Sequence, residues 1–588
     1  MQISAVVVVY RTPASVIPYE PDCTTGFGCY RIMSKFNPIT LMNRHLLFSL
    51  VALLASCLTL AAASGGKLYE GFGDYHRAMS TDSAKAQKLF DQGMQLMYGF
   101  NHDEAIRSFH AAAKADPQAA MPWWGIAYSH GVNINDPEMS DERWQLAREA
   151  ADAALERLSG ATPVEKALVK AVSKRYEYPA PEEVSQLSQA FADAMEKAYE
   201  QFPEDPEVGT IFGDSLMNLQ PWDYWENDGS PKGRVQEIVE VLERTLKWHP
   251  NHPGANHFYI HTVEASNDPD RAEQAADTLR TLVPGSGHLV HMPSHIYVRI
   301  GRYADAVDSN ADAVKADRAY FKRAPEPEMY AIYYAHNLHF LSYAAMMSGR
   351  YEDAMRAARD LENEMPEGPL KEFAPLIDGI MPSNFHALIR FGKWEEVLEE
   401  PAYKDWRLVS NAVRLYARSI ACSALGRTKQ AREEMMAFNK AVEAVPEDWH
   451  IFNNPVNKVL PIAQCMIQGE LLWREGKKEK AFALLREGIA GEDALIYDEP
   501  PGWMLPVRHA LGALLMADGR AEEAETVYRE DIVRNRNNGW GLIGLQNSLR
   551  AQGKYEEAQA LDAKIQAAWA KADVRPTSSC YCEPGAAE

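Results

Sequence analysis

The sequence is short of basic residues. Of its 588 residues, 60 are lysine or arginine and 82 are aspartate or glutamate, so the formal net charge is -22 at pH 7. Binding to nucleic-acid phosphates requires a concentrated basic surface. This composition excludes a nucleic-acid partner, and we expect none.

Cysteine is scarce as well, with seven residues in the chain. Cys580 and Cys582 stand one residue apart near the C-terminus, where a disulfide between them would be strained, so we interpret them as part of a tail. Beyond residue 64 no run of 18 apolar residues predicts a membrane span. A Ser-His-Asp order, a glycine-rich phosphate loop and a Cys-x-x-Cys pair are also missing, so the sequence matches no known enzyme signature.

Residues 42–64 have the pattern of a secretory signal. A basic start at Arg44 is followed by a short apolar core and then by small residues. Residues 1–41 precede this signal, and we interpret them as a mis-assigned extension. Two maturation routes stay open: "LASC" at 54–57 resembles a bacterial lipobox that would lipidate Cys57, or cleavage after the alanines releases a soluble protein. Both predict export, to the periplasm or to a lipid anchor that is the only membrane contact.

The rest of the chain repeats one phrase. "GRYADAVDSNADAVKAD" begins at 301, "GRYEDAMRAARDLENEMP" at 349 and "GKYEEAQALDAKI" at 553. Three steps between turn positions are 34 residues long: 267 to 301, 392 to 426 and 519 to 553. Other steps are longer, so the array is interrupted.

These phrases resemble the tetratricopeptide (TPR) repeat family, here of a bacterial exported type, and Gly93, Ala105, Phe109 and Pro117 stand at its characteristic spacing. The resemblance implies an all-α superhelical solenoid of helix-turn-helix repeats, in which neighbouring units cover each other's apolar faces. We expect N-terminal repeats over 66–250, central histidine-rich repeats over 251–400, C-terminal repeats over 401–572, and a flexible tail over 573–588. No specific enzyme is recognised.

Histidine is concentrated in the central repeats, where nine of the 17 fall between residues 249 and 339. Several share a register of 13, 10, 6 or 3 residues before a turn position, which keeps side chains on one helical face. In the TPR family this face lines the concave groove. The residues in this register are His257, His261 and Glu264 before Asn267; His288, His291 and His295 before Gly301; and His336 and His339 before Gly349.

This set predicts a transition-metal site. Imidazole-rich sites suit zinc, copper, iron or nickel, and with no cysteine and one carboxylate in the register we expect copper or zinc. Eight candidates exceed the four ligands of one tetrahedral ion, so either more than one ion binds or some histidines orient others. Glu264 would be a ligand or a general base. The alternative is a groove that binds an anion or a peptide.

Side chains beside the register are expected to form a substrate wall. They are Trp124, Trp222, Asp223, Arg299, Tyr343 and His386. The stretch "YDEPPGW" from Tyr497 to Trp503 carries a diproline that forces extended backbone. It is either a loop that packs back over the superhelix or, the interpretation we favour, a plain repeat junction.

Two functions follow from these expectations. One is a metal-dependent enzyme, a copper oxidoreductase slightly ahead of a zinc hydrolase. The other is a non-catalytic TPR scaffold or metal-carrying protein, because the fold by itself says little about function. Partners would be a small molecule or peptide in the concave groove, or another protein.

Overall fold

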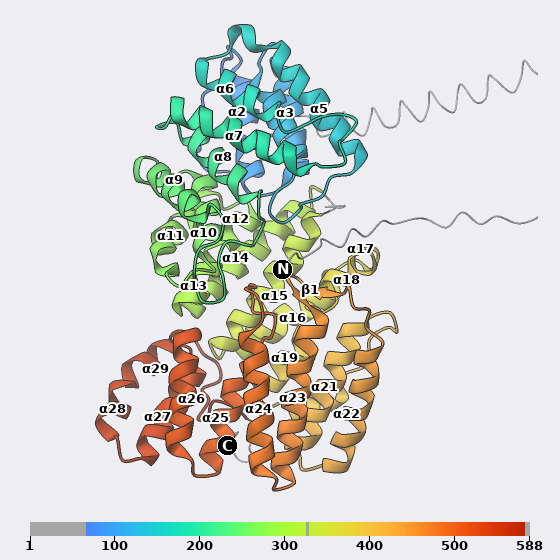
Figure 1. The fold of residues 1–588 in the computed structure, drawn as a ribbon, viewed down its shortest axis with the longest axis vertical. Coiled ribbons are helices and arrows are strands. Elements are labelled where there is room, and N and C mark those ends of the chain that lie inside the picture. The colour runs from blue at the N-terminus through green and yellow to red at the C-terminus, as the bar shows by residue number, and fades with distance from the viewer. Residues whose placement is uncertain (1–65, 325–328, 582–588) are drawn as a thin grey trace, which may run out of the picture. The chain divides into compact units, whose positions relative to one another are not determined.

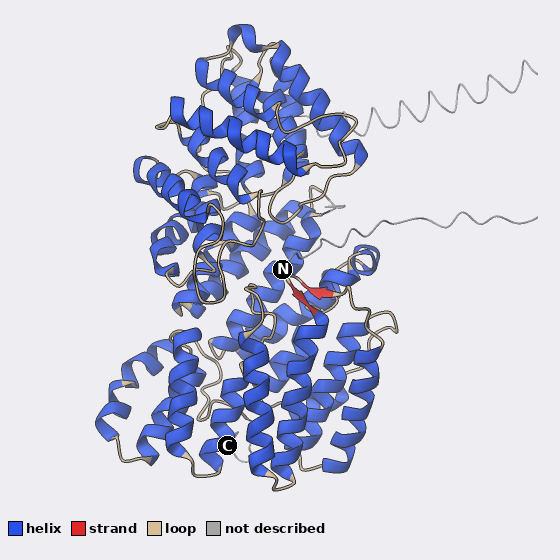
Figure 2. Cartoon of the chain, in the orientation of Figure 1, coloured by secondary structure: helices blue, strands red, loops and turns tan. Residues whose placement is uncertain are grey.

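The computed structural model describes residues 66–324 and 329–581, and these residues belong to one compact unit. The predictions for 1–41, for the signal at 42–64 with Cys57, and for Cys582 lie outside them. Figure 2 shows a chain made almost entirely of helices, with one two-stranded antiparallel sheet between β1 (His450–Ile451) and β2 (Asn454–Pro455). The predicted all-α fold class is confirmed.

The helices follow one another as antiparallel pairs (Figure 1). In the first half of the chain the pairs are α2 (Ala84–Tyr98) with α3 (His102–Ala115), α4 (Met121–His130) with α5 (Asp141–Glu156), α6 (Pro163–Val172) with α7 (Ser185–Gln201), α8 (Pro206–Met217) with α9 (Val235–Trp248), α10 (Pro253–Val263) with α11 (Glu273–Leu282), and α12 (Gly287–His291) plus α13 (Pro293–Ile300) with α14 (Tyr303–Phe321).

The second half continues the same order. Its pairs are α15 (Tyr330–Met347) with α16 (Tyr351–Glu364), α19 (Ser383–Arg390) with α20 (Trp394–Glu399), α21 (Leu408–Ala424) with α22 (Thr428–Glu443), α23 (Val456–Arg474) with α24 (Lys478–Asp493), α25 (Val507–Ala517) with α26 (Ala521–Arg534), and α27 (Gly539–Ala551) with α28 (Tyr555–Ala560). The remaining short helices are η1 (Leu158–Gly160), η2 (Pro269–Ala272), α17 (Glu367–Glu372), α18 (Ala374–Ile377) and α29 (Asp562–Ala568).

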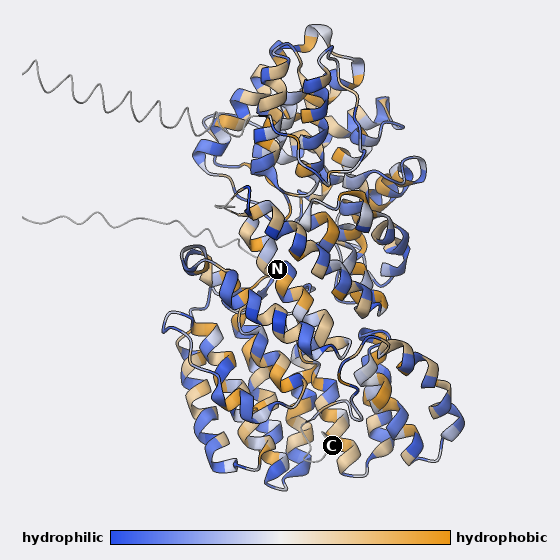
Figure 3. Cartoon of the chain, turned by 180° about the vertical axis from the view of Figure 1, so that it is seen from behind, coloured by the Kyte–Doolittle hydropathy of each residue, from blue (hydrophilic) through white to orange (hydrophobic). Residues whose placement is uncertain are grey.

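Small residues let consecutive pairs approach closely. A Cβ on Gly93 of α2 would lie 2.5 Å from the Phe109 ring of α3, and one on Gly125 of α4 would lie 2.7 Å from the other side of that ring. The Phe109 ring is therefore packed between Gly93 and Gly125 of two successive repeats, as the TPR spacing predicts. The first helix of a pair also contacts the first helix of the next, as α21 does with α23. Single helices in Figure 3 carry both apolar and hydrophilic residues, which fits one covered and one exposed side.

Seven glycines close the turns between paired helices with a left-handed backbone. Their φ angles lie between +65° and +83°, a region that only glycine adopts at little cost. They are Gly301, Gly349, Gly392, Gly426, Gly476, Gly519 and Gly553. All of them except Gly476 are turn positions given by the repeated phrase and its steps, whereas Asn267, also used as a turn position, does not have a left-handed backbone.

The segment 573–581 packs against several repeats, contrary to the expectation of a flexible tail from 573 onward. The Asp573 carboxylate accepts hydrogen bonds from the backbone N–H groups of Tyr351 and Glu352 at 2.7 and 2.9 Å, at the start of α16. Ser579 donates to the His509 carbonyl at 2.8 Å. Cys580 is bonded in a disulfide, which the sequence analysis did not expect.

Within 66–324 and 329–581, none of the helices is both long enough and apolar enough to cross a bilayer.

Comparison of two turn glycines separates the effect of backbone strain from the effect of side-chain packing. A Cβ on Gly301 (φ +83°) would lie 2.3 Å from the Arg536 carbonyl oxygen, whereas one on Gly426 (φ +72°) would meet nothing within 4 Å. We expect Gly426→Ala to lower the free energy of unfolding by about 1 kcal/mol through backbone strain alone, and Gly301→Ala to lower it at least twice as much. Urea unfolding checks this. Equal losses would show that the 536 segment does not press on this turn.

Candidate metal centre

Helix α10 carries the first part of the histidine register, and every one of its residues is buried. It contacts α2, α8, α9, α11 and α13, so no face is left for solvent. A helix that is covered all round ordinarily has apolar residues on every side. This one carries His257 and His261 instead and ends at Glu264, which is itself fully buried.

The next first helix is interrupted at a proline. Pro293 has no N–H to donate, and the helix divides there into α12 and α13. His288 and His291 lie on α12 and His295 on α13. All three side chains are nonetheless buried, so the break does not turn them away from α10.

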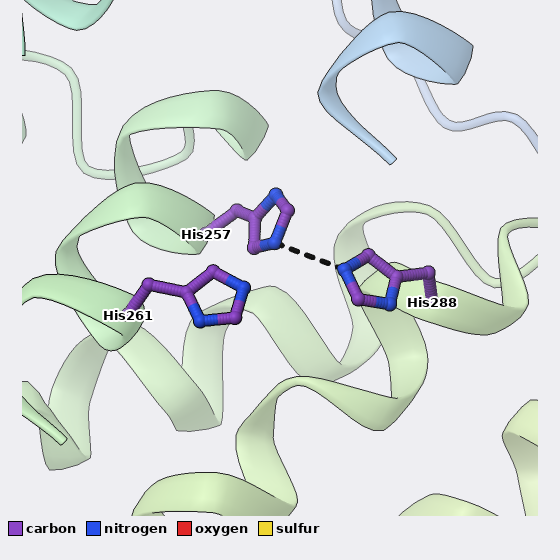
Figure 4. A group of neighbouring side chains, drawn as sticks. All are labelled: His257, His261 and His288. Atoms are coloured by element: carbon purple, nitrogen blue, oxygen red, sulfur yellow. Dashed lines mark hydrogen bonds between the residues drawn. The ribbon is translucent and has the colours of Figure 1, made fainter. Parts of the chain in front are cut away.

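The first histidine trio consists of His257, His261 and His288, whose ligand atoms lie within 4.8 Å of one another. Figure 4 shows His257 and His261 side by side on one helix, facing His288 from another. The Nδ1 of His257 lies 2.6 Å from the Tyr98 carbonyl oxygen, so Nδ1 carries the proton. Its Nε2 lone pair points at His288 Nε2, 3.1 Å away. His261 Nε2 and His288 Nδ1 are buried without a hydrogen-bond partner.

The second histidine trio consists of His291, His295 and His336, again within 4.8 Å. His291 Nδ1 donates to the Asn310 Oδ1 at 2.6 Å, and the Asn310 amide nitrogen donates to Ala306, which fixes this orientation. His295 Nδ1 donates to Glu264. The Nε2 atoms of His291 and His295 then face each other at 2.8 Å, each with its lone pair. Only a proton or a metal ion between them makes this contact favourable.

One carboxylate joins the two trios. Glu264 accepts from His261 Nδ1 at 2.8 Å with one oxygen and from His295 Nδ1 with the other. Burial opposes its ionisation, but the neighbouring His295 and His261 outweigh burial and lower the pKa of Glu264 to about 2. Burial likewise disfavours the charged form of His295, yet the Glu264 carboxylate outweighs it and raises the pKa of His295.

The other imidazoles of the two trios are held neutral. Burial is the largest cause, and adjacent histidines add to it, so the pKa values of His257, His288, His291 and His336 fall well below the usual range. Neutral imidazole is the form that binds metal ions. An Nδ1–H held by an oxygen acceptor with a free Nε2 is the arrangement usual for metal-binding histidines.

Aromatic side chains in unusual backbone conformations cover the trios. Phe100, Trp222 and Phe452 have φ values of 54°, 62° and 48°. These values lie in the left-handed region, which is energetically unfavourable for any residue other than glycine. Their rings lie 4.6 Å from His257, 5.3 Å from His261 and 5.5 Å from His336, respectively. At this point loops from distant repeats fill the predicted concave groove and bury the trio histidines except the partly exposed His336.

His339 is the one predicted ligand that lies outside both trios. Its Nε2 faces the Met504 sulfur at 3.3 Å, and it lines a small cavity together with His386 and Trp503. Both His339 Nδ1 and His386 Nδ1 are buried without a hydrogen-bond partner. The register places His339 on the expected face of α15, but at the position of His339 this face packs against residues 501–504 and not against the trios.

A cavity of about 570 Å³ lies near Glu264, although no trio histidine lines it. The loop between α24 and α25 forms one wall with Tyr497, Glu499 and Trp503, and Arg299 and Tyr343 lie on another side. The Tyr497 hydroxyl donates to Glu499 and lies 3.4 Å from Glu264. The diproline stretch is thus a loop packed back over the superhelix, and the favoured interpretation as a plain junction is wrong. We call this space the Glu499 cavity.

The predicted substrate wall is divided by the structure. Arg299 and Tyr343 line the Glu499 cavity, and Arg299 also donates to the Glu264 carbonyl at 2.9 Å. Trp222 covers His261. Trp124, in contrast, is core, buried and stacked on Tyr128 at 5.6 Å. The Asp223 side chain is 63% exposed and pairs with Lys232 at 2.5 Å, away from the histidines.

Comparisons with known proteins give no family. No family model and no curated protein matches the chain. Among solved structures, the human IFIT1 dimer with m7Gppp-AAAA is similar over 80% of this chain and 94% of that chain, with 10% identity and a TM-score of 0.31. Yeast Tom70 is similar over 82% and 96%, with 12% identity and a TM-score of 0.27. Scores this low carry no argument about function.

The helix pairs, their turn glycines and the Phe109 ring packed between two repeats define a helical-repeat protein of TPR type. Its distinguishing feature is a cluster of six histidines and one glutamate that is buried except at the partly exposed His336.

The shared carboxylate gives a test that needs no metal. An amide at position 264 offers an oxygen to one histidine N–H but an NH₂ group to the other, which leaves buried groups unpaired. We expect Glu264→Gln to lower the free energy of unfolding of the chelator-treated protein by about 3 kcal/mol. Asp223→Asn, at an exposed ion pair, should leave the unfolding midpoint unchanged. Equal stabilities of the two variants would show that Glu264 does not hold the trios together.

Proposed function

We propose that this protein is a transition-metal protein with one ion in each histidine trio, and that copper is the preferred ion. The observation that carries the proposal is the set of Nε2 atoms that are unpartnered or face one another at 2.8 and 3.1 Å. Imidazole nitrogens bind such ions at about 2.0–2.1 Å, which places two ligands of one ion about 3 Å apart. Among divalent ions, copper binds nitrogen ligands most tightly.

The enclosed histidine ligands suit an ion that stays bound to the protein rather than one that the protein delivers elsewhere. Five of the six trio histidines are buried and His336 is partly exposed, whereas rapid exchange of an ion requires ready access from solvent. Glu264 is occupied at both oxygens by histidine N–H groups and has a low pKa, so its role is to orient His261 and His295 rather than to act as a general base.

The Glu499 cavity favours an enzyme over a carrier. Its wall residue Tyr497 reaches Glu264, which orients His295, and the cavity is large enough for a small substrate. A copper ion held by the trios would supply redox chemistry, and a zinc ion would instead activate a water molecule. The chain's own residues would position the ions and bound molecule and keep bulk water away. The helical-repeat fold favours the second candidate, a non-catalytic scaffold, because such repeats offer extended binding surfaces.

Metal analysis separates these functions. We expect the mature protein, purified without chelator, to contain about two equivalents of copper by elemental analysis, because the two trios would each hold one ion. The His291→Ala/His295→Ala variant should lose one equivalent and His257→Ala the other. His386→Ala, a buried histidine outside the trios, should retain both. All variants must remain helical by circular dichroism.

Absence of metal from the parent, even after reconstitution with copper or zinc, would eliminate the metal proposal and leave the scaffold. Retention of both ions by the double variant would place the sites elsewhere.

We also propose that the protein is exported, through the signal at residues 42–64. Intact-mass measurement of the expressed chain should show either a lipidated Cys57 at the new N-terminus or an unlipidated chain cleaved after the alanines. Cys57→Ser should abolish processing in the first case and leave it unchanged in the second. A mature mass that still includes residues 42–64 would contradict export by this signal.

A further inference from the structure

The Glu499 cavity contains buried carboxyl groups that have no ion-pair partner among the described residues. Glu492, Asp498 and Glu499 are between 4% and 7% exposed. Glu492 accepts from the Val507 N–H at 3.0 Å, and Asp498 from the Asn453 N–H at 3.1 Å, so the donors are neutral. Glu499 accepts from the Tyr497 hydroxyl with one oxygen, while the other oxygen is buried without a partner.

The basic residues of the cavity are engaged by other groups. Arg299 donates to the carbonyl oxygens of Glu264 and Ser266 at 2.9 and 3.0 Å. Arg534 pairs with Asp493 at 3.2 Å, and Arg536 pairs with Asp270. These cations therefore leave Glu492, Asp498 and Glu499 without an ion-pair partner. Burial opposes the ionisation of Glu492 and Glu499 and raises their pKa values to about 7, so a cation that enters the cavity would favour their charged form.

The rest of the lining indicates what kind of cation would fit. Aromatic rings surround the space: Trp225, Tyr303, Tyr343, Tyr497 and Trp503. Such rings attract cations through their faces and also cover apolar groups. The Trp503 indole N–H is buried without a hydrogen-bond partner. The three carboxyls do not form a group that converges on one metal ion among the described residues.

We propose that the Glu499 cavity binds a small organic amine, with its ammonium group at Glu499 and its apolar body between the aromatic rings. A volume of about 570 Å³ suits a small ligand of this kind. The Tyr497 hydroxyl joins Glu499 to Glu264, the carboxylate that orients His261 and His295. The amine would thus be linked to the trios through Tyr497 and Glu264. This inference deepens the proposed function by naming its substrate class, but binding itself uses groups of the cavity alone.

Calorimetric titration of the chelator-treated, full-length mature protein tests the proposal without metal. The probes are 2-phenylethylamine, 1,4-diaminobutane and the uncharged 2-phenylethanol. We expect saturable binding of at least one amine at one site, and binding of the alcohol at least tenfold weaker, because it lacks the charge. Glu499→Gln should weaken amine binding at least tenfold. Asp493→Asn, which alters a carboxylate of the same cavity that is already paired with arginines, should change it less than twofold.

Failure of both amines to bind, binding equal to that of the alcohol, or binding that Glu499→Gln leaves intact would overturn the proposal. A melting curve of each variant shows whether it is folded, and Glu492→Gln replaces Glu499→Gln if the latter is not. Metal content, measured separately on untreated protein, reports on the histidine trios. A negative result for amine binding therefore does not decide whether the histidine trios bind metal.

Discussion

The Glu264 carboxylate is the constraint on which the rest of the centre depends. A buried negative charge is costly unless donors surround it, and here the donors come from two different helices, His261 on α10 and His295 on α13. Their N–H groups can both reach the carboxylate only at one separation of these helices. The same bonds turn each Nε2 toward its own trio. One charge thus fixes the helix packing, the tautomers and the direction of the lone pairs together.

The repeat architecture supplies rigidity, and its loops supply enclosure. First helices of neighbouring repeats bring the histidines together, because each one packs against the next. What closes the space is irregular: Phe100, Trp222 and Phe452 reach the histidines from backbone conformations that few residues with side chains adopt. Strain of this kind persists where the surrounding structure holds it in place. Here a closely packed cover over the histidines compensates for it.

The sequence predicts the helices, turns and shared face well, because period and glycine position are local properties. Six of the seven predicted histidines and Glu264 come together for that reason. His339 does not, since an offset along one helix says nothing of how the neighbouring helix is rotated. Tyr497 and Glu499 were visible only as part of a diproline loop, because the contact between Tyr497 and Glu264 spans 233 residues. Phe100 and Phe452 left no signal, because their role depends on tertiary packing.

The residues that surround the histidines come from distant parts of the chain, and this bears on the order in which the site forms during folding. The Tyr98 carbonyl that sets the His257 tautomer lies near the start of the repeats, and Tyr497 lies near their end. A chain that stops at the central repeats has the histidines and the Tyr98 acceptor, but it lacks Phe452 and the loop at Tyr497. If the trios hold ions as proposed, such an incomplete chain would offer them an open, exchangeable set of imidazoles. The enclosed form of the proposed site would then arise only after the repeats that carry Phe452 and Tyr497 have joined the fold.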